Sequence, residues 1–283
     1  MLTVSAPAKI NLILEVLSKY EDDYHQVFSI VQTINLCDTL KFELAEEISF
    51  KCSEPGLESD NLVIKAATLL KKVTKCSKGA GIELCKRIPW GVGLGGGSSD
   101  AAATLSALNK LWQLELSTPE LLNLASKIGS DVPFFIHGGT ALVEGRGGKI
   151  TPLLPLPTTN FVLLVPPLPK IPNKTKQLYN KLNINHYTTG QFVHSALASW
   201  SGRKRFNSSL IFNVFEKVAF DVFSELEEYK KIFEEAGASN VHLAGSGPAL
   251  FTLVSDEEEA NELCSLLEKR GLECYAVFSF PLE

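Results

Sequence analysis

A dense run of glycine between residues 89 and 103 constrains the fold of this chain more than any other feature. The run is PWGVGLGGGSSDAAA, and five of the seven residues from Gly91 to Gly97 are glycine. Because glycine lacks a Cβ atom, such a backbone bends sharply and its N–H groups can close around an anion. The alanine-rich stretch that follows predicts a helix, whose N-terminus adds unpaired N–H groups and partial positive charge. The pattern therefore predicts a phosphate-binding loop, with Ser98-Ser99-Asp100 capping the helix.

This loop differs from two better-known phosphate-binding loops. No Gly-Lys-Ser/Thr sequence ends it, which excludes a Walker A loop. Gly91, Gly93 and Gly96 satisfy G-x-G-x-x-G, but a dinucleotide site also needs a clean strand before the loop and an acidic residue about 20 positions later. Pro89 interrupts the lead-in, and Glu115 lies at the end of a helix rather than of a strand. From these residues alone, a flexible surface loop remains the alternative.

Composition indicates an ordinary globular enzyme. The chain has 283 residues, of which 45% are hydrophobic and 21% charged, so it can bury a core without disulfides or metals. A net charge of −5 argues against nucleic acid as a main partner. The only basic cluster is Arg203-Lys204-Arg205, which we interpret as a solvated turn rather than a binding patch.

The cysteines and the N-terminus bear on the compartment. The six cysteines show no C-x-x-C spacing and no partnered histidines, which favours reduced, mostly buried thiols over disulfides or zinc. No basic segment followed by an apolar one stands at the N-terminus, and no apolar stretch is long enough to span a membrane. We therefore expect a cytoplasmic protein without a membrane partner.

Periodicity predicts the elements of the first half. Alternation of apolar and polar residues over 2–18 and parts of 27–50 predicts strands. Helices are expected from Asp60, as a cap, through Lys72, and from Thr118 to Gly129. A strand over 81–87 leads into the glycine loop, and a hairpin is expected over 140–154.

In the second half, strands alternate with long amphipathic helices. We expect strands at 161–165, 241–244, 249–254 and 273–280, and helices at 174–184, 210–236 and 256–270. This alternation predicts an α+β sandwich of the ferredoxin-like, split βαβ kind. Prolines at 152, 155 and 157 place a boundary between an N-terminal α/β domain at 1–156 and a C-terminal domain at 157–283.

Three motifs, in order, carry a resemblance to a known superfamily. They are Pro7-Ala8-Lys9-Ile10-Asn11-Leu12, the glycine–serine loop, and Leu243-Ala244-Gly245-Ser246-Gly247-Pro248. They resemble the motifs of the GHMP kinases, which phosphorylate hydroxyl groups of small metabolites with ATP. Further hints come from Tyr24-His25, Asp60-Asn61-Leu62 and Gly129-Ser130-Asp131-Val132-Pro133-Phe134. Within the superfamily the chain resembles the kinases of the non-mevalonate isoprenoid pathway that act on a diphosphocytidyl sugar alcohol.

The resemblance implies a catalytic pair. Asp131 would be the general base that takes the hydroxyl proton, and Lys9 would lie beside it and keep its carboxylate charged. From the residues alone, Asp131 could instead cap the next short helix, and Lys9 could form a structural salt bridge. Asn11, on the same strand face as Lys9, would orient the acceptor hydroxyl or Asp131, or serve as a bonded amide in a half-buried strand.

The resemblance also implies the nucleotide site. The expected ATP-binding residues are Asn61, Lys86, Pro89, Trp90, Gly91, Val92, Gly93, Leu94, Gly95, Gly96, Gly97, Ser98 and Ser99. Magnesium is expected with ATP, with Ser98 or Ser99 as the only ligands we can suggest. Trp90 could equally be a core aromatic. We expect a β-branched residue at Gly96 to resist a positive φ and to intrude on the phosphate path.

The acceptor site is expected around a cytidine pocket. Tyr24 and His25 would form one side of the pocket, and Tyr179 would stack on the other. Gly245 and Ser246 would shape the end of the site, with Ser246 on the acceptor's phosphates. Asp23 stands where the family usually has glycine, and the segment before Tyr179 is spaced more widely than in the family.

Other functions remain open at this point. The chain could be another GHMP kinase, such as a homoserine or mevalonate kinase, which would lack the Tyr24-His25 pair. It could also be an inactive relative, but Lys9, Asp131 and the loop glycines are all present. The partners expected are small molecules, in a monomer or homodimer.

Overall fold

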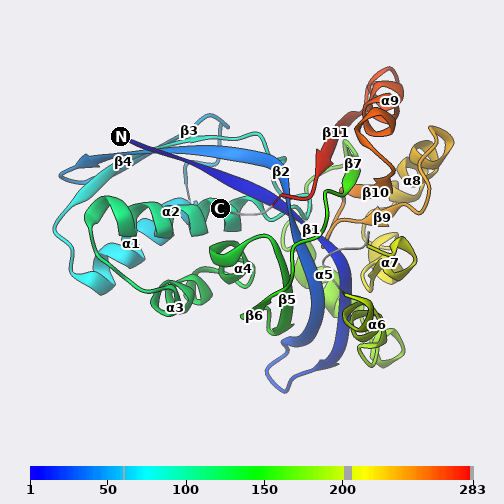
Figure 1. Ribbon diagram of the computed structural model, residues 1–283, viewed down its shortest axis with the longest axis horizontal. Helices are drawn as coiled ribbons and strands as arrows, with labels where there is room; N and C mark the ends of the chain where they lie inside the picture. The colour runs from blue at the N-terminus through cyan, green and yellow to red at the C-terminus, as the bar shows by residue number, and fades with distance from the viewer. Residues whose placement is uncertain (60, 201–205, 281–283) are drawn as a thin grey trace.

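The computed structural model describes residues 1–59, 61–200 and 206–280 (Figure 1). In these residues the larger sheet has seven strands in the order β3-β4-β2-β1-β8, with β5 and then β6 extending from β2. Its strands are β1 (Leu2–Lys19), β2 (His25–Ala45), β3 (Ile48–Cys52), β4 (Gly79–Cys85), β5 (Thr140–Gly145), β6 (Lys149–Pro152) and β8 (Phe212–Asn213).

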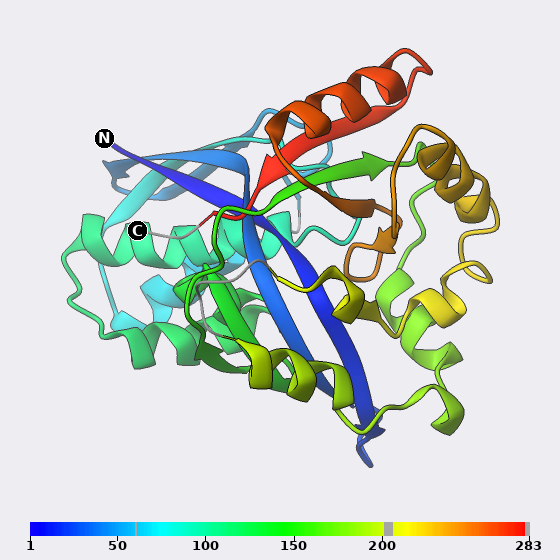
Figure 2. The ribbon, with the colours of Figure 1, turned by 45° about the vertical axis from the view of Figure 1, so that its right-hand side comes forward.

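Strands β1 and β2 form a long antiparallel ribbon that runs through the whole molecule (Figures 1 and 2). The alternating burial expected along β1 holds only near its ends, because every residue from Ala6 to Val16 is buried. Helices cover one face of this stretch, and the second half of the chain covers the other. Such two-sided coverage explains why residues on both faces of the strand are buried, including the polar Lys9, Asn11 and Glu15.

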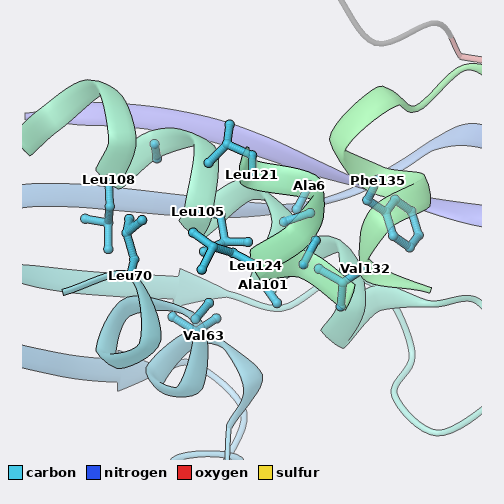
Figure 3. Close-up of a cluster of buried hydrophobic side chains, with 14 of the residues drawn as sticks. Ala6, Val63, Leu70, Ala101, Leu105, Leu108, Leu121, Leu124, Val132 and Phe135 are labelled. Atoms are coloured by element: carbon cyan, nitrogen blue, oxygen red, sulfur yellow. The ribbon is translucent and has the colours of Figure 1, made fainter. Parts of the chain in front are cut away.

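Four helices of the first half pack below the larger sheet: α1 (Leu62–Thr74), α2 (Gly96–Trp112), α3 (Thr118–Ile128) and α4 (Val132–His137). Figure 3 shows apolar side chains of these helices gathered in one cluster, among them Leu105 and Leu108 of α2, Leu70 of α1 and Leu124 of α3. The carboxylate of Glu120 accepts from the N–H of Ser117 and so closes the first turn of α3. This packing fixes the start of α2, which carries the glycine loop.

The second sheet is built from the C-terminal half. Its order is β11-β7-β10-β9, and all three pairings are antiparallel. The strands are β7 (Asn160–Val165), β9 (His242–Leu243), β10 (Leu250–Val254) and β11 (Glu273–Phe278). Helices lie between β7 and β9 and between β10 and β11, where α9 (Glu257–Glu268) packs on the sheet. The predicted split βαβ arrangement is therefore confirmed.

The continuous helix predicted over 210–236 is wrong. This segment contains β8, α7 (Glu216–Ala219) and α8 (Leu226–Glu235). Strand β8 pairs in parallel with Ile13 and Leu14 of β1, and a tertiary pairing of this kind overrides a helical pattern. The region from 174 to 199 also differs from expectation, because α5 (Lys174–Lys181) is followed by a short 3₁₀ turn and by α6 (Gln191–Ser199), which the sequence did not predict.

Smaller expectations are corrected as well. The side chain of Asn61, which accepts from the N–H of Val63, caps α1; Asp60 and the basic cluster at 203–205 lie outside the described residues. Only Cys264 and Cys274 of the six cysteines are buried, so the thiols are not mostly buried. Among the described residues, no helix is long and apolar enough to cross a membrane.

Candidate active site

The three predicted motifs meet at the glycine loop. The N–H of Lys9 in β1 donates to the carbonyl of Leu94 at 2.9 Å, and the N–H of Ala249 donates to that of Val92 at 3.2 Å. A Cβ atom on Gly93 would stand 2.1 Å from the carbonyl oxygen of Ala244. Segments far apart in the chain thus hold the loop from both sides, and this close approach requires glycine at position 93.

Glycine conformation sets the shape of the loop. Gly91, Gly93 and Gly95 have φ of 79°, 98° and 74°, in the left-handed region that favours glycine. Helix α2 begins at Gly96 with Gly95 as its cap residue, so the prediction that Ser98-Ser99-Asp100 caps this helix is wrong. Gly96 is helical, and the expectation of a positive φ there is also wrong. A Cβ atom at Gly96 would instead approach Ile88 and Lys86.

A buried lysine and an exposed carboxylate lie beside the loop. The Nζ atom of Lys9 is 4.0 Å from Oδ2 of Asp131, and the two side chains are 8% and 55% exposed. Lys9 donates to Oδ1 of Asn11 at 2.7 Å, and Asn11 donates to the hydroxyl of Ser29 at 2.9 Å. Asn11 therefore orients Lys9 directly. Burial lowers the pKa of Lys9, and the charge of Asp131 opposes that shift.

Asp131 occupies the N-cap position of α4, but its side chain makes no capping hydrogen bond. The capping role that the sequence left open is thus not seen, and the carboxylate is free to face a reactant. Pro133 and Phe134 behind it are buried and fix the backbone that carries Asp131.

Two cavities lie near the glycine loop, and Lys9 and Asp131 line one of them. The smaller, of about 360 Å³, is lined by Pro89, Trp90, Gly91 and Val92 of the loop together with the proline-rich segment 166–169. The larger, of about 770 Å³, contains the predicted acceptor residues. It is lined by Lys9, Asn11, Tyr24, His25, Asp131, Tyr179, Gly245 and Ser246, among others. Lys9 and Asp131 thus share the larger cavity with every predicted acceptor residue.

Three predicted nucleotide residues, Asn61, Trp90 and Lys86, lie beside the glycines of the loop or before them in the sequence. Asn61 caps α1 and donates from its amide to the carbonyl of Leu57. Trp90 is 38% exposed at the smaller cavity, which does not fit the alternative of a core aromatic. Lys86 lines the same cavity, but its ammonium group is engaged in ion pairs.

Those ion pairs join two carboxylates, of which the sequence analysis named only Asp100, as a helix cap. Lys86 contacts Oδ2 of Asp38 at 2.5 Å and Oδ2 of Asp100 at 2.9 Å. Asp38 also accepts from the N–H groups of Arg87 and Ile88, so it holds the segment that enters the loop. Burial raises the pKa of Asp100 to about 7, against the opposing charge of Lys86. In the sequence, Asp38 stands in a predicted strand beside other polar residues and belongs to none of the motifs.

Two of the predicted cytidine residues, His25 and Tyr179, both line the larger cavity but contact each other directly, rather than standing on opposite sides of an open space. His25 of β2 and Tyr179 of α5 stack with ring centroids 4.7 Å apart, and Tyr179 also packs edge-on against Phe215. The Nε2 atom of His25 is buried and has no hydrogen-bond partner in the described residues. Desolvation lowers the pKa of His25, which favours the neutral ring. Asp23 adopts a φ of 68° and so takes the conformation expected of glycine.

Tyr24 is 56% exposed and lies at the mouth of this cavity. The guanidinium group of Arg146 sits 5.0 Å from the centre of the Tyr24 ring and pairs with Asp22 at 2.5 Å. Arg146 comes from the β5–β6 hairpin and was not predicted as a site residue. It joins that hairpin to the turn between β1 and β2 at the rim of the cavity.

Comparisons with known proteins agree with this geometry. Residues 61–139 match the model of the GHMP kinases N terminal domain, and residues 194–271 match the GHMP kinases C terminal model. A 4-diphosphocytidyl-2-C-methyl-D-erythritol kinase of Dehalococcoides mccartyi is 44% identical, with all of both chains covered. The chain belongs to the 4-diphosphocytidyl-2-C-methyl-D-erythritol kinase family of the GHMP kinases.

Other relatives support the same family. The kinase of this name from Shouchella clausii is 40% identical over 97% of this chain and 93% of its own length. A solved structure titled as 4-(cytidine 5'-diphospho)-2C-methyl-D-erythritol kinase superposes with a TM-score of 0.80 at 32% identity, covering 99% of this chain and 100% of that one. A homoserine kinase from Cytophaga hutchinsonii, with a TM-score of 0.70 at 18% identity over 99% and 95% of the chains, shows the fold alone.

These findings confirm the predicted superfamily and the two-domain GHMP kinase fold. As a GHMP kinase, the chain is a phosphotransferase that uses ATP. The predicted division of the domains at residue 156 remains a prediction.

Proposed function

We propose that this kinase transfers the γ-phosphoryl group of ATP to the 2-hydroxyl group of 4-diphosphocytidyl-2-C-methyl-D-erythritol, in isoprenoid precursor biosynthesis. The carrying observation is that Lys9 and Asp131 line one cavity with His25 and Tyr179, while the glycine loop borders another cavity beside it. The relatives that share 44% and 40% of their residues with this chain bear the name of this activity.

In this proposal Asp131 accepts the proton of the attacking hydroxyl group. Its carboxylate is exposed to the cavity, is held at the start of α4 and makes no capping bond that would compete. Lys9 places an ammonium group beside the same point and is oriented by Asn11. Phosphoryl transfer depends mainly on positioning and on charge stabilisation, which these groups can supply.

The glycine loop and the first turn of α2 would bind the phosphates of ATP with Mg²⁺. No group of three metal-ligating His, Cys, Asp or Glu side chains occurs among the described residues. The hydroxyl of Ser99 at this helix start is buried without a hydrogen-bond partner in the described part of the chain. These residues fit an ion that is held mostly by the substrate phosphates, with Ser98 or Ser99 as a protein ligand. When bound, Mg²⁺ would neutralise phosphate charge.

A coupled assay of ADP release with a panel of acceptors tests the proposal. We expect turnover with 4-diphosphocytidyl-2-C-methyl-D-erythritol and at least a hundredfold lower kcat/KM with homoserine or mevalonate, because neither presents a base to His25 and Tyr179. Equal use of acceptors that lack cytidine would overturn the proposed substrate, and the GHMP kinase family would still stand.

The Asp131→Asn variant tests the catalytic roles. It should bind ATP normally but turn over about 10²–10⁴-fold more slowly, the usual range for a lost general base. Lys9→Ala should act in the same direction, and the double variant should lose less than the product of the single losses, because the two residues work as a unit. Steady-state kinetics with calorimetric ATP binding measures both. A loss below about tenfold for Asp131→Asn would exclude it as the base.

A further inference from the structure

Lys174 lies where the two cavities approach each other. It is the first residue of α5, directly after Asn173, which has a φ of 53°. Lys174 lines the smaller cavity, on the side of the glycine loop, while the next residue, Thr175, lines the larger one with Tyr179. The motifs in the sequence did not single out Lys174.

Among residues 1–59, 61–200 and 206–280, the hydrogen-bond partners of the ammonium group of Lys174 are all neutral oxygens. It donates to the hydroxyl of Ser246 at 2.7 Å and to the carbonyls of Ser246 and Gly247 at 3.2 and 2.5 Å. In the part of the chain that the structure describes, no carboxylate oxygen lies within 4.0 Å of this Nζ atom. Lys174 is partly buried, and a lysine partly withdrawn from water ordinarily has an anionic partner, so its position points to an anion that is not part of the protein.

A second lysine lies on the other side of the same turn. A Cβ atom on Gly245 would stand 2.7 Å from the Nζ of Lys9, while Lys174 binds the turn at Ser246 and Gly247. Burial, the charge of Lys9 and the opposing charge of Asp131 together bring the pKa of Lys174 to about 7. Two ammonium groups therefore face one carboxylate, and an anion between them would remove this repulsion.

We propose that Lys174 binds a phosphate oxygen of a reactant at the junction of the two cavities and acts with Lys9 as a second cation in phosphoryl transfer. This inference rests on the proposed function and names a further catalytic residue for it. During transfer, the acceptor oxygen forms a bond to the γ-phosphorus and the bond to the ADP oxygen breaks. The hydroxyl proton goes to Asp131, and ADP leaves with the bonding electrons. Lys174 would stabilise negative charge on the non-bridging oxygens.

The phosphate oxygen can come from either of two sources, the γ-phosphate of ATP or the diphosphate of the acceptor. The Lys174→Met variant keeps the length of the side chain and removes its charge, and Lys174→Arg keeps the charge. Lys181→Met, at the exposed end of the same helix, is the matched control. Each is compared with the wild type by steady-state kinetics, by calorimetry with ATP and with ADP, and by thermal unfolding.

We expect Lys174→Met to lose about 10²–10³-fold in kcat/KM, as for a lost donor to a developing charge, while Lys174→Arg stays within about tenfold. If Lys174 contacts the γ-phosphate, Lys174→Met should lower the affinity for ATP about tenfold and the affinity for ADP less than threefold. If Lys174 contacts the diphosphate of the acceptor instead, Lys174→Met should raise the acceptor KM by a similar factor and leave the affinity for ATP unchanged. Either pattern supports the proposal and identifies the source.

The proposal is overturned if folded Lys174→Met keeps kcat/KM within threefold of the Lys181→Met control. It is also overturned if Lys174→Met lowers only the melting temperature, because Lys174 would then merely fasten α5 to the turn at Ser246. Should wild-type enzyme fail to phosphorylate the proposed acceptor, the proposed function fails. The comparison of ATP with ADP affinity would still test the phosphate contact of Lys174.

Discussion

At the scale of single residues, the centre of the site is arranged around charge that the protein does not balance by itself. Lys9 is buried, lies 4.0 Å from a half-exposed carboxylate and is held by an amide. Among the described residues, the hydrogen-bond partners of Lys174 are all neutral oxygens. Keeping such groups out of water costs free energy of folding, and that cost is offset when an anionic reactant binds.

Lys174 should make stability depend on pH. Its pKa is about 7 in the folded chain and 10.5 at its ordinary value, so between these values the unfolded state binds a proton that the folded state lacks. Stability of the wild type therefore rises with pH across this window, and Lys174→Met removes the rise. The difference in melting temperature between the variant and the wild type should change steadily from about pH 7 to about pH 10. A difference that does not vary with pH would contradict this prediction.

The stacked pair His25 and Tyr179 should control use of the acceptor. His25→Ala removes groups that can bond a base edge, and Tyr179→Ala removes a stacking face, each worth about 1–3 kcal/mol. The acceptor KM should rise about five- to a hundredfold, with the KM for ATP nearly constant. His137→Ala, at the end of α4 and not among the residues that line the cavity, serves as the control. A rise confined to the KM for ATP would reverse the assignment.

At the scale of elements, the glycine loop depends on how closely its neighbours approach. Gly91 and Gly93 both have positive φ, but a Cβ atom at Gly91 meets nothing within 4 Å, whereas one at Gly93 would stand 2.1 Å from the carbonyl of Ala244. The two positions thus separate backbone strain from steric conflict. The loop is shaped as much by the turn at Ala244 as by its own residues.

Alanine at these two positions should have different effects. Gly91→Ala should cost about 1–3 kcal/mol of stability from strain at positive φ and should still bind ATP. Gly93→Ala should cost about 1–3 kcal/mol more, because the loop must move away from Ala244, and its ATP affinity should fall at least tenfold. Chemical denaturation with calorimetry measures both quantities. Equal effects of the two variants would show that the contact with Ala244 does not shape the loop.

At the scale of the whole molecule, one short strand joins the halves. Asn213 of β8 is buried, pairs with Leu14 of β1 and donates its amide to the carbonyls of Leu243 and Gly245, each at 2.8 Å. Its Oδ1 atom accepts from the N–H of Phe215. A single side chain thus connects the larger sheet, the turn beside Lys9 and the wall of the acceptor cavity.

Asn213→Leu should therefore disturb both stability and activity. It leaves three backbone groups without partners, and we expect a loss of about 2–5 kcal/mol in the free energy of unfolding. The kcat/KM should fall as well, since the turn at Gly245 loses its support. Urea denaturation and steady-state kinetics measure the two effects. As a control, Asn185→Ala at an exposed site should change the free energy of unfolding by no more than about 0.5 kcal/mol. An equally small change for Asn213→Leu would contradict the proposed role of Asn213 in joining the two halves.

The local chemistry of this protein could be predicted from its sequence. Glycine density, the helix after Gly97 and the position of Asp131 before Val132 depend on neighbouring residues, so the glycine loop and the motif residues could be picked out without the structure. The superfamily and the split βαβ arrangement followed from motif order and from the alternation of strands and helices.

Only the tertiary structure decided which of these residues act together. The pairing of Lys86 with Asp38 and Asp100, the position of Lys174 at the turn of Ser246 and the parallel pairing of β8 with β1 join segments far apart in the chain. No local periodicity records such contacts, and for residues 210–236 the local pattern even favoured the wrong element. Burial and charge at the site arise when the two sheets pack together, and they determine that Lys9 lies beside a carboxylate while Lys174 has neutral partners in the described part of the chain.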